Sequence, residues 1–319
     1  MVIAILTSGG DAPGMNAAIR AVVRAGLSQG WEVLGISRGY AGLLAGDMRE
    51  MTSVSVSEII QRGGTVLYTA RSEELMTLGG QARAAAMCRE KGIDALVVLG
   101  GDGSLKGALA LSELGINVIG IPATIDLDVA CTEYSIGFDT AVNTAMNAID
   151  KIRDTSSSHE RCSIVEVMGR YAGYIALHCG IATGAEDILL PENYDGNEKK
   201  IIEKVLAGRK SGKKHHLIIN AEGVGDSAGM AGRIEEATGV ETRATILGYL
   251  QRGGSPTCRD RIMATRMGVK AVQLIAEGKK NRVVAVQNGS LTDYDIKDAL
   301  NMQKEIEEDL VSMLPLLVR

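Results

Sequence analysis

Two carboxylates separated by one residue lie in the segment Pro122-Ala123-Thr124-Ile125-Asp126-Leu127-Asp128. The segment follows an apolar run, residues 118–121, that is typical of a buried strand. We therefore expect it at the carboxyl end of that strand, where open α/β sheets bind ligands. One carboxylate in such a turn can act as a general base, while the other binds a metal ion or pairs with a lysine. Read alone, the segment is more simply explained as a polar turn that caps a helix.

Two glycine-rich loops precede this segment in the chain. The first, residues 7–16, follows an apolar run at residues 2–6, and the second, Gly100-Gly101-Asp102-Gly103-Ser104, follows a run at residues 95–99. Glycine lets the backbone approach an anion, and a helix that begins after such a loop offers unpaired N–H groups, so both loops are candidate phosphate sites. Asp102 adds a carboxylate that can hold Mg²⁺. Each loop alone is also explained as a tight structural turn.

Neither loop has the pattern of a P-loop or of the common dinucleotide-binding fingerprint. Three strand ends that each carry anion or metal chemistry favour phosphoryl transfer, a reaction that depends on positioning and charge neutralisation. A planar guanidinium group can bind two phosphate oxygens at once, so arginines near loops are candidate partners of a phosphorylated substrate. Any single arginine is more often a solvated surface charge. Arg71 follows a strand-like segment. The candidate arginines are Arg71, Arg161, Arg170, Arg243 and Arg252.

Composition sets limits on the class of protein. A chain of 319 residues exceeds the usual size of a single core, so we expect two domains. The net charge of −5 disfavours a general nucleic-acid or membrane surface, so we expect neither partner. Five cysteines without a C-x-x-C pair indicate neither a disulfide framework nor a zinc site, and reduced, mostly buried thiols in a soluble cytoplasmic protein fit them best.

Apolar runs and helical spacing predict the fold class. Helix-like segments separate the runs, and apolar residues from Phe138 to Ile152 recur at three- and four-residue intervals, which predicts a helix that ends before Thr155. Strands that alternate with helices predict an α/β fold with a mainly parallel sheet covered on both faces. The segment Gln61-Arg62-Gly63-Gly64-Thr65 echoes residues 251–255, a match too short to separate an internal repeat from chance. The predicted strands are residues 2–6, 95–99, 118–121, 164–167, 217–219 and 283–286.

Taken together, these motifs resemble those of the bacterial type of ATP-dependent 6-phosphofructokinase, over nearly the whole chain. The resemblance implies the phosphofructokinase fold, with two lobes of similar topology that are each a mainly parallel sheet flanked by helices. It implies an ATP-binding lobe at residues 1–137 and 251–301 and a fructose 6-phosphate-binding lobe at residues 138–250 and 302–319. The motifs that carry it are residues 7–16, 100–104, 124–128, 153–161, 165–170, 241–248 and 251–256.

The implied reaction moves the γ-phosphoryl of MgATP to the 1-hydroxyl of fructose 6-phosphate, giving fructose 1,6-bisphosphate and ADP. The resemblance implies Asp126 as the general base, Thr124 and Arg71 as stabilisers of the moving phosphoryl group, and Asp102, helped by Asp128, as the Mg²⁺ site. The other implied nucleotide positions are Gly10, Ser72, Gly101, Gly103 and Ser104. The implied sugar-phosphate positions, besides Thr124 and Asp126, are Met168, Gly169, Arg170, Glu222, Tyr249 and Arg252, with Arg161 and Arg243 from a neighbouring subunit of a homotetramer. Arg170 is also implied in catalysis.

An effector site for ADP or phosphoenolpyruvate is implied as well. Its positions are Arg20, Arg24, Arg153, Glu186, Lys213 and Lys214. Arg20 and Arg24 are equally explained as charges on the solvated face of one helix. Ser53 and Ser211 stand where relatives often have basic residues, so we expect weaker anion binding there.

Four positions bear on the details of the activity. Leu127 stands where the family commonly has asparagine, and Tyr249 where it usually has histidine, so Tyr249 can donate a hydrogen bond without a charge near neutrality. Gly103 and Ala123 are small where pyrophosphate-using relatives tend to carry aspartate and lysine, which favours ATP as the donor. The alternatives are a pyrophosphate-dependent enzyme, an NAD or lipid kinase with a similar glycine loop, and a catalytically silent sugar-phosphate sensor.

Overall fold

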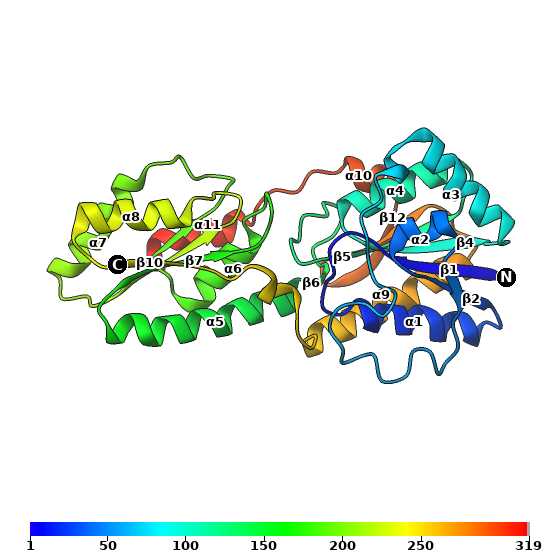
Figure 1. Ribbon diagram of the computed structural model, residues 1–319, viewed down its shortest axis with the longest axis horizontal. Helices are drawn as coiled ribbons and strands as arrows, with labels where there is room; N and C mark the ends of the chain where they lie inside the picture. The colour runs from blue at the N-terminus through cyan, green and yellow to red at the C-terminus, as the bar shows by residue number, and fades with distance from the viewer. Residues whose placement is uncertain (318–319) are drawn as a thin grey trace. The chain divides into compact units, whose positions relative to one another are not determined.

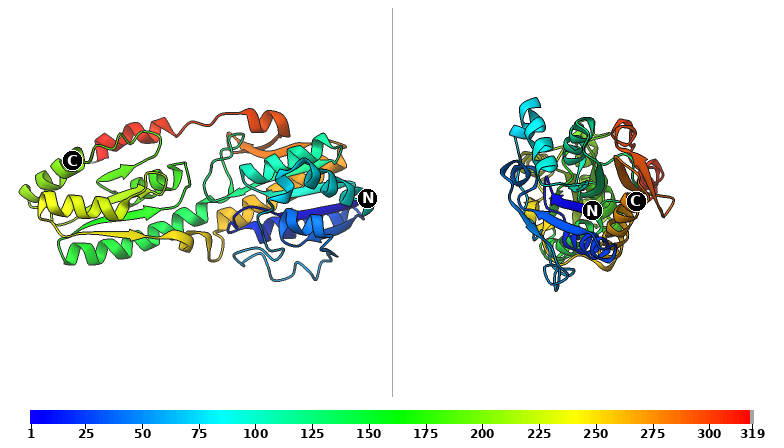
Figure 2. Two further views of the ribbon diagram at one scale, coloured as in Figure 1. Left: turned by 45° about the horizontal axis from the view of Figure 1, so that its top comes forward. Right: turned by 90° about the vertical axis from the view of Figure 1, so that its right-hand side faces the viewer.

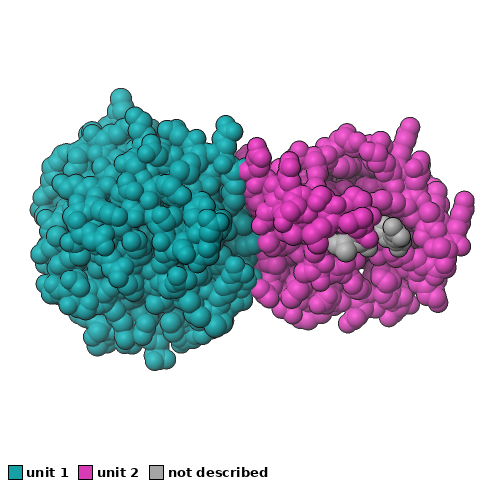
Figure 3. All heavy atoms as spheres, turned by 180° about the vertical axis from the view of Figure 1, so that it is seen from behind, with its two compact units in different colours: residues 1–140, 252–304 teal, residues 141–251, 305–319 magenta. Residues whose placement is uncertain are grey.

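The computed structural model describes residues 1–317, which divide into two compact units (Figure 3). Unit 1 consists of Met1–Thr140 and Arg252–Lys304, and unit 2 consists of Ala141–Gln251 and the chain from Glu305 onward. Each unit is therefore assembled from two stretches of sequence. Within the described residues, no helix has the length and apolar character needed to cross a membrane.

Unit 1 is built on an eight-stranded sheet in the order β12-β11-β5-β4-β1-β2-β3, with β6 paired to β5. The strands are β1 (Val2–Thr7), β2 (Glu32–Ile36), β3 (Met48–Glu50), β4 (Ala95–Gly100), β5 (Val118–Thr124), β6 (Ile136–Gly137), β11 (Arg282–Gln287) and β12 (Ser290–Asp295). The pairs β2–β3 and β11–β12 at the two edges are antiparallel, and the interior pairs are parallel. The carboxyl ends of β1, β4 and β5 consequently lie side by side at one edge of the sheet.

Helices cover both faces of this sheet (Figure 1). They are α1 (Met15–Ser28), α2 (Gly39–Ala45), α3 (Leu78–Glu90), α4 (Asp102–Glu113), α9 (Cys258–Ala276), α10 (Ile296–Asn301) and the 3-10 turn η1 (Glu74–Met76). Helices α1 and α9 lie against each other on one face (Figure 2), where a side chain on Gly268 would come within 2.7 Å of the Ala21 methyl group. On the other face, Ala4 and Leu6 of β1 join the core beneath α2, α3 and α4. Alternate residues of each strand thus pack on opposite layers, as expected of a sheet buried on both sides.

Unit 2 contains a four-stranded parallel sheet in the order β10-β7-β9-β8. Its strands are β7 (Cys162–Val167), β8 (Asp187–Leu189), β9 (His216–Ala221) and β10 (Thr242–Ile246). Its helices are α6 (Tyr174–Thr183), α7 (Glu198–Lys210), α8 (Ser227–Thr238) and α11 (Glu308–Leu317), while α5 (Phe138–Ser158) and the 3-10 turn η2 (Gly248–Arg252) run across the boundaries of the units. Ile164 and Ile218 form a core with Ile201 of α7 and Ile234 of α8.

The predicted α/β class with a mainly parallel sheet is confirmed, and all six apolar runs form strands. The predicted end of the helix before Thr155 is wrong, because α5 continues through Ser158. There the Ser158 hydroxyl donates to the Asp154 carbonyl at 2.9 Å, so the serine binds the backbone of the helix instead of ending it.

All five cysteines are free thiols, as predicted, and all but Cys258 are buried. Burial raises the pKa of the Cys88 and Cys131 thiols to about 11 and that of Cys162 and Cys179 to about 12. The four buried thiols therefore remain protonated near neutral pH and serve as small core residues.

Candidate active site

The three motifs singled out in the sequence meet at adjacent strand ends of unit 1. The Ser8 N–H donates to the Leu99 carbonyl at 2.9 Å, which joins the end of β1 to the end of β4. A side chain on Gly101 would lie 3.3 Å from the Cβ of Thr124, so the loop after β4 closely approaches the end of β5. The prediction that each motif follows the carboxyl end of a strand is confirmed, and the sheet order places these strand ends side by side.

The first glycine loop turns directly into α1. Gly14 precedes the helix with φ of 105°, a left-handed conformation that suits glycine and lets the N-terminus of α1 open toward the loop. Arg252 packs on this loop, and its Nη1 donates to the Asp11 carbonyl at 3.1 Å. A side chain on Gly10 would overlap the Arg252 guanidinium, so the arginine lies directly against this glycine.

The segment that leads to Arg71 is held by side chains from β1 and α1. The Thr7 hydroxyl donates to the Tyr68 carbonyl at 2.8 Å, and the Thr69 hydroxyl donates to the Gly9 carbonyl at 2.7 Å. These bonds bring the chain over the first glycine loop immediately before the exposed Arg71. The expectation of a strand before Arg71 is wrong, because the backbone here bonds to side chains and turns instead of joining a ladder.

Asn16 fixes the earlier part of the same segment. Its side-chain amide donates to the carbonyls of Arg62 and Gly63 at 3.1 and 3.2 Å, and its oxygen accepts the Val66 N–H at 2.8 Å. A side chain on Gly63 would overlap the Gly254 carbonyl oxygen, so the two similar segments around residues 61–65 and 251–255 lie against each other. Their contact is a packing of two glycine-rich turns in unit 1.

The second glycine loop delivers Asp102 to the first turn of α4. Gly101 precedes the helix, and the buried Ser104 completes its first turn through an N–H bond to the Gly101 carbonyl at 3.0 Å. The Asp102 carboxylate lies 2.6 Å from the ammonium of Lys106, one turn further along. No atom lies within 4 Å of where a side chain on Gly103 would begin, so the space over this residue is open.

The turn after β5 holds the paired carboxylates. Thr124 and Asp126 are only 8% and 7% exposed, and the Asp126 N–H donates to the Thr124 hydroxyl oxygen at 3.2 Å. Between the carboxylates, Leu127 is buried and adopts φ of 56°. This left-handed conformation costs a residue other than glycine about 1–3 kcal/mol, so the surroundings must hold the turn in place.

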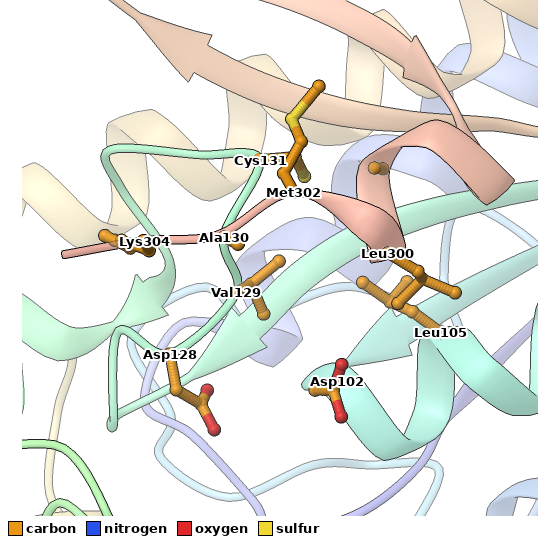
Figure 4. Close-up of a pocket in the computed structure, with 10 residues that line it drawn as sticks. Asp102, Leu105, Asp128, Val129, Ala130, Cys131, Leu300, Met302 and Lys304 are labelled. Atoms are coloured by element: carbon orange, nitrogen blue, oxygen red, sulfur yellow. The ribbon is translucent and has the colours of Figure 1, made fainter.

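A pocket of about 220 Å³ adjoins this turn, and Asp102, Asp128 and Lys304 line it together with apolar side chains such as Cys131 and Met302. Figure 4 shows the two carboxylates on one side of the pocket, away from Cys131 and Met302. Among residues 1–317, no cluster of three or more His, Cys, Asp or Glu side chains could hold a metal ion by itself. Mg²⁺ is usually held by one or two carboxylates together with substrate phosphates and water, so Asp102 and Asp128 fit such an ion.

In unit 2, Glu222 organises the turn after β7. Its Oε1 accepts the N–H groups of Gly169 and Arg170 at 3.2 and 2.5 Å, and the Met168 N–H donates to Gln251 at 3.2 Å. Gly169 and Arg170 have φ of 142° and 58°, which gives a sharp turn. Met168, Gly169, Arg170 and Glu222 are thus gathered at the carboxyl ends of β7 and β9.

Arg161 and Arg243 lie at the other edge of the same sheet, at the amino ends of β7 and β10. Both pair with Glu241, each at 2.7 Å, and these guanidinium groups lower the pKa of its carboxyl. The six residues of β7 separate this pair from the turn at Arg170, a distance of roughly 17–20 Å along an extended strand. A single copy of unit 2 therefore does not bring the two groups of predicted sugar-phosphate residues into one site.

The candidate effector residues divide between the units. Arg20 and Arg24 lie on α1 in unit 1, and the other four lie in unit 2. Lys213 pairs with Glu186 at 2.7 Å, Lys214 pairs with Glu160 at 3.0 Å, and the Arg153 guanidinium donates to the Thr183 carbonyl. Lys213 and Lys214 also line a pocket of about 290 Å³ together with three histidines that the sequence patterns did not indicate, His159, His215 and His216.

Three further residues of these sites escaped the sequence analysis. Lys106 could have been found, because its position four residues after Asp102 on a helix predicts the ion pair. Glu241 begins the motif at residues 241–248, but the sequence analysis gave it no role of its own and did not foresee its ion pairs with Arg161 and Arg243. Nothing local in the sequence indicates that Lys304 reaches the turn after β5.

Unit 1 carries glycine loops and carboxylates at adjacent strand ends, and the second α/β unit carries arginines in its loops. These features define a phosphate-handling α/β protein. The chain belongs to the phosphofructokinase family, because the sequence model described as Phosphofructokinase matches residues 2–275.

Two curated relatives and one solved structure are similar to this chain over nearly its whole length. A curated ATP-dependent 6-phosphofructokinase from Clostridium botulinum is 56% identical over 315 residues, 99% of this chain and 98% of the relative. One of the same name from Clostridium tetani is 58% identical over 309 residues, 97% and 96% of the two chains. Among solved structures, the phosphofructokinase of Pichia pastoris in the T-state superposes with a TM-score of 0.88 at 34% identity, covering 99% of this chain and 36% of that one.

Proposed function

We propose that the protein is an ATP-dependent 6-phosphofructokinase that acts in the cytoplasm in the committed step of glycolysis. It transfers the γ-phosphoryl of MgATP to the 1-hydroxyl of fructose 6-phosphate and yields fructose 1,6-bisphosphate and ADP. The observation that carries the proposal is the convergence of two glycine loops and the Asp126 turn at adjacent strand ends, in a chain 56% identical over its length to a relative of that name.

The nucleotide binds at the two glycine loops of unit 1. Residues 101–104 supply backbone N–H groups at the N-terminus of α4, which favours the negative charge of the phosphates, and Gly10 lies in the loop that leads to α1. Arg71 and Ser72 follow the segment that Thr7 holds over the first loop, so their side chains can close on the phosphates. The open space over Gly103 leaves room for the rest of the nucleotide, which supports ATP rather than pyrophosphate as the donor.

Asp126 is the general base. Its carboxylate takes the proton of the 1-hydroxyl as that oxygen bonds to the γ-phosphorus, and the bond from the γ-phosphorus to the bridging oxygen of ADP breaks. The buried Thr124 hydroxyl, which already contacts the Asp126 N–H, and the guanidinium of Arg71 stabilise the charge of the moving phosphoryl group, as does Arg170. Burial around Asp126 limits competition from water for the same proton.

Asp102 would hold Mg²⁺, and Asp128, which lines the same pocket, would help to hold it. The ion would supply positive charge that neutralises the phosphates of ATP. The ammonium of Lys106, one helical turn further along α4, lies 2.6 Å from the Asp102 carboxylate.

The sugar phosphate is recognised by residues of unit 2 and by Arg252. Met168, Gly169, Arg170, Glu222 and Tyr249 form the part of the site that one subunit supplies. Arg161 and Arg243 lie at the opposite edge of the sheet, so they serve the site of a neighbouring subunit. This sharing supports a homotetramer, with ADP or phosphoenolpyruvate as an effector at Arg20, Arg24, Arg153, Glu186, Lys213 and Lys214.

A coupled assay that offers fructose 6-phosphate with either ATP or pyrophosphate tests the proposal. We expect fructose 1,6-bisphosphate with MgATP and none with pyrophosphate. Product with pyrophosphate alone would reassign the donor, and no product with either donor would leave only a sugar-phosphate sensor.

A further inference from the structure

Lys304, the last residue of unit 1, reaches back to the turn that follows Asp126. Its ammonium donates to the main-chain carbonyls of Leu127 and Thr132, each at 2.9 Å. These two carbonyls begin and end the segment of residues 127–132, which includes Asp128. A charged donor makes a stronger hydrogen bond to a carbonyl than a neutral one does, so one half-buried lysine side chain ties both ends of the segment.

The turn needs such an anchor because of Leu127. Its φ of 56° lies in the left-handed region, which asparagine and aspartate tolerate because their side chains can bond to the local backbone. Leucine has no such group. What holds its conformation is the burial of its side chain, 4% exposed, and the bond from its carbonyl to Lys304.

The far end of the segment is fixed to the sheet. The Thr132 hydroxyl donates to the Tyr134 carbonyl and accepts the Val286 N–H, both at 2.9 Å, and the Glu133 N–H donates to the Val286 carbonyl at 3.0 Å. Val286 belongs to β11, so this end of the segment moves only with the sheet. Lys304 joins that fixed end to the left-handed turn beside Asp126.

We infer that Lys304 is a positioning residue for the proposed phosphoryl transfer, because it holds the Leu127 carbonyl and thereby orients the carboxylates of Asp126 and Asp128. The inference rests on the proposed function. It assigns Lys304 no contact with either substrate, so its loss should slow the chemical step and spare substrate binding.

The first experiment compares Lys304→Met and Lys304→Arg with the unchanged enzyme. We expect kcat of Lys304→Met to fall by about 10- to 100-fold, the size of effect that follows a displacement of about 1 Å in a catalytic group. KM for ATP and for fructose 6-phosphate should stay within about threefold, because the binding groups are untouched. Lys304→Arg keeps a charged donor and should recover most of kcat. Lys297→Met, an exposed lysine on α10, is the matched control and should behave like the unchanged enzyme.

A second experiment uses the pocket beside Lys304. Because Lys304 lines this space of about 220 Å³, shortening it in Lys304→Ala opens room for a small ammonium ion at the vacated position. Ethylammonium should raise kcat of Lys304→Ala in proportion to its concentration, while ethanol, similar in size but uncharged, should not. A purely structural role for the lysine stem would not give this difference between the two additives.

The inference has a readout that does not depend on activity. Hydrogen exchange of the main-chain amides in residues 126–133 should be faster in Lys304→Met than in the unchanged protein, with the glycine loop at residues 7–16 unaffected. If the protein without substitutions has no activity, the proposed function is refuted, but the comparison of hydrogen exchange can still be made.

Four outcomes would overturn the role of Lys304. In the kinetic experiments, these are an active enzyme whose kcat does not change in Lys304→Met, and a loss of kcat that neither Lys304→Arg nor ethylammonium restores. The other two are unchanged hydrogen exchange in residues 126–133, and failure of both Lys304→Ala and Lys304→Met to fold.

Discussion

The carboxylate of Glu222 accepts a hydrogen bond from the main-chain N–H of Arg170 at 2.5 Å. Both residues are predicted to bind the sugar phosphate, and Glu222 also shapes the turn that carries Arg170. Arg170 has φ of 58° in this turn, and the carboxylate bonds to two successive N–H groups there. Glu222 therefore shapes the backbone of this turn, in addition to the contact with the sugar phosphate that we propose for it.

Glu222→Leu removes the acceptor, whereas Glu222→Gln keeps an oxygen at the same place. We expect Glu222→Leu to raise KM for fructose 6-phosphate by about tenfold or more, since it leaves the N–H of the buried Gly169 unpaired and an unpaired buried N–H costs about 1–3 kcal/mol. Glu222→Gln should raise KM less, and KM for ATP should stay constant in both variants. Steady-state kinetics with each substrate varied in turn checks this. Equal KM values for the two variants would show that the turn does not depend on the acceptor.

Gly63 tests the packing of the two similar glycine segments. Gly63→Ala should lower the free energy of unfolding by about 1–3 kcal/mol, because the new methyl group would meet the Gly254 backbone, which cannot move aside as a side chain can. Gly232→Ala is the matched control. It lies within α8, where a methyl group meets no atom within 4 Å, and should stabilise the protein slightly. Urea unfolding of both variants measures the difference, and equal stabilities would contradict the contact.

The strand ends that carry the proposed chemistry could be predicted because each follows an uninterrupted apolar run. Residues 118–121 are all buried in β5, and such a run has no polar face to turn toward solvent. β8 (Asp187–Leu189) was not predicted, because it begins with a buried carboxylate. Asp187 tolerates burial through a hydrogen bond with His216 at 2.9 Å and an ion pair with Lys204 at 2.5 Å. Neither partner is adjacent to it in the sequence, so no local pattern reveals the strand.

The same limit applies to the candidate site. Local spacing placed Asp126 and Asp128 in one turn, since two residues so close in sequence must share it. It could not place Lys304 on that turn, or Arg252 on the first glycine loop, because each joins its partner through the fold of unit 1. Such long-range contacts depend on the order of strands in the sheet, which apolar runs do not encode.

Glu186 gives a prediction for the dependence of stability on pH. Burial alone would raise the pKa of its carboxyl, but the bonds from Lys213 and from the Leu217 N–H outweigh burial, so the pKa lies below its ordinary value. A lowered pKa in the folded protein means that the carboxylate contributes stability above its unfolded pKa of about 4.3. That contribution is lost as the pH falls through the folded pKa.

Lys213→Met should therefore destabilise the protein at pH 7, and the difference from the unchanged protein should shrink as the pH falls through the lowered pKa of Glu186 in the folded protein, because the carboxyl then becomes protonated. Lys214→Met is the control, because its pair with Glu160 is largely exposed and such pairs contribute about 0–1 kcal/mol. Denaturant unfolding of the unliganded proteins across this pH range provides the comparison. A destabilisation that does not change with pH would show that Lys213 acts through packing alone.

The rate of phosphoryl transfer by Asp126→Ser, measured with MgATP and fructose 6-phosphate, tests the account most directly. We predict that kcat falls by about 10²- to 10⁴-fold, because proton removal by a positioned base acts in the transition state, while calorimetry shows that both substrates bind with nearly unchanged Kd. An Asp126→Ser variant whose kcat equals that of the unchanged enzyme would contradict the assignment of Asp126 as the base.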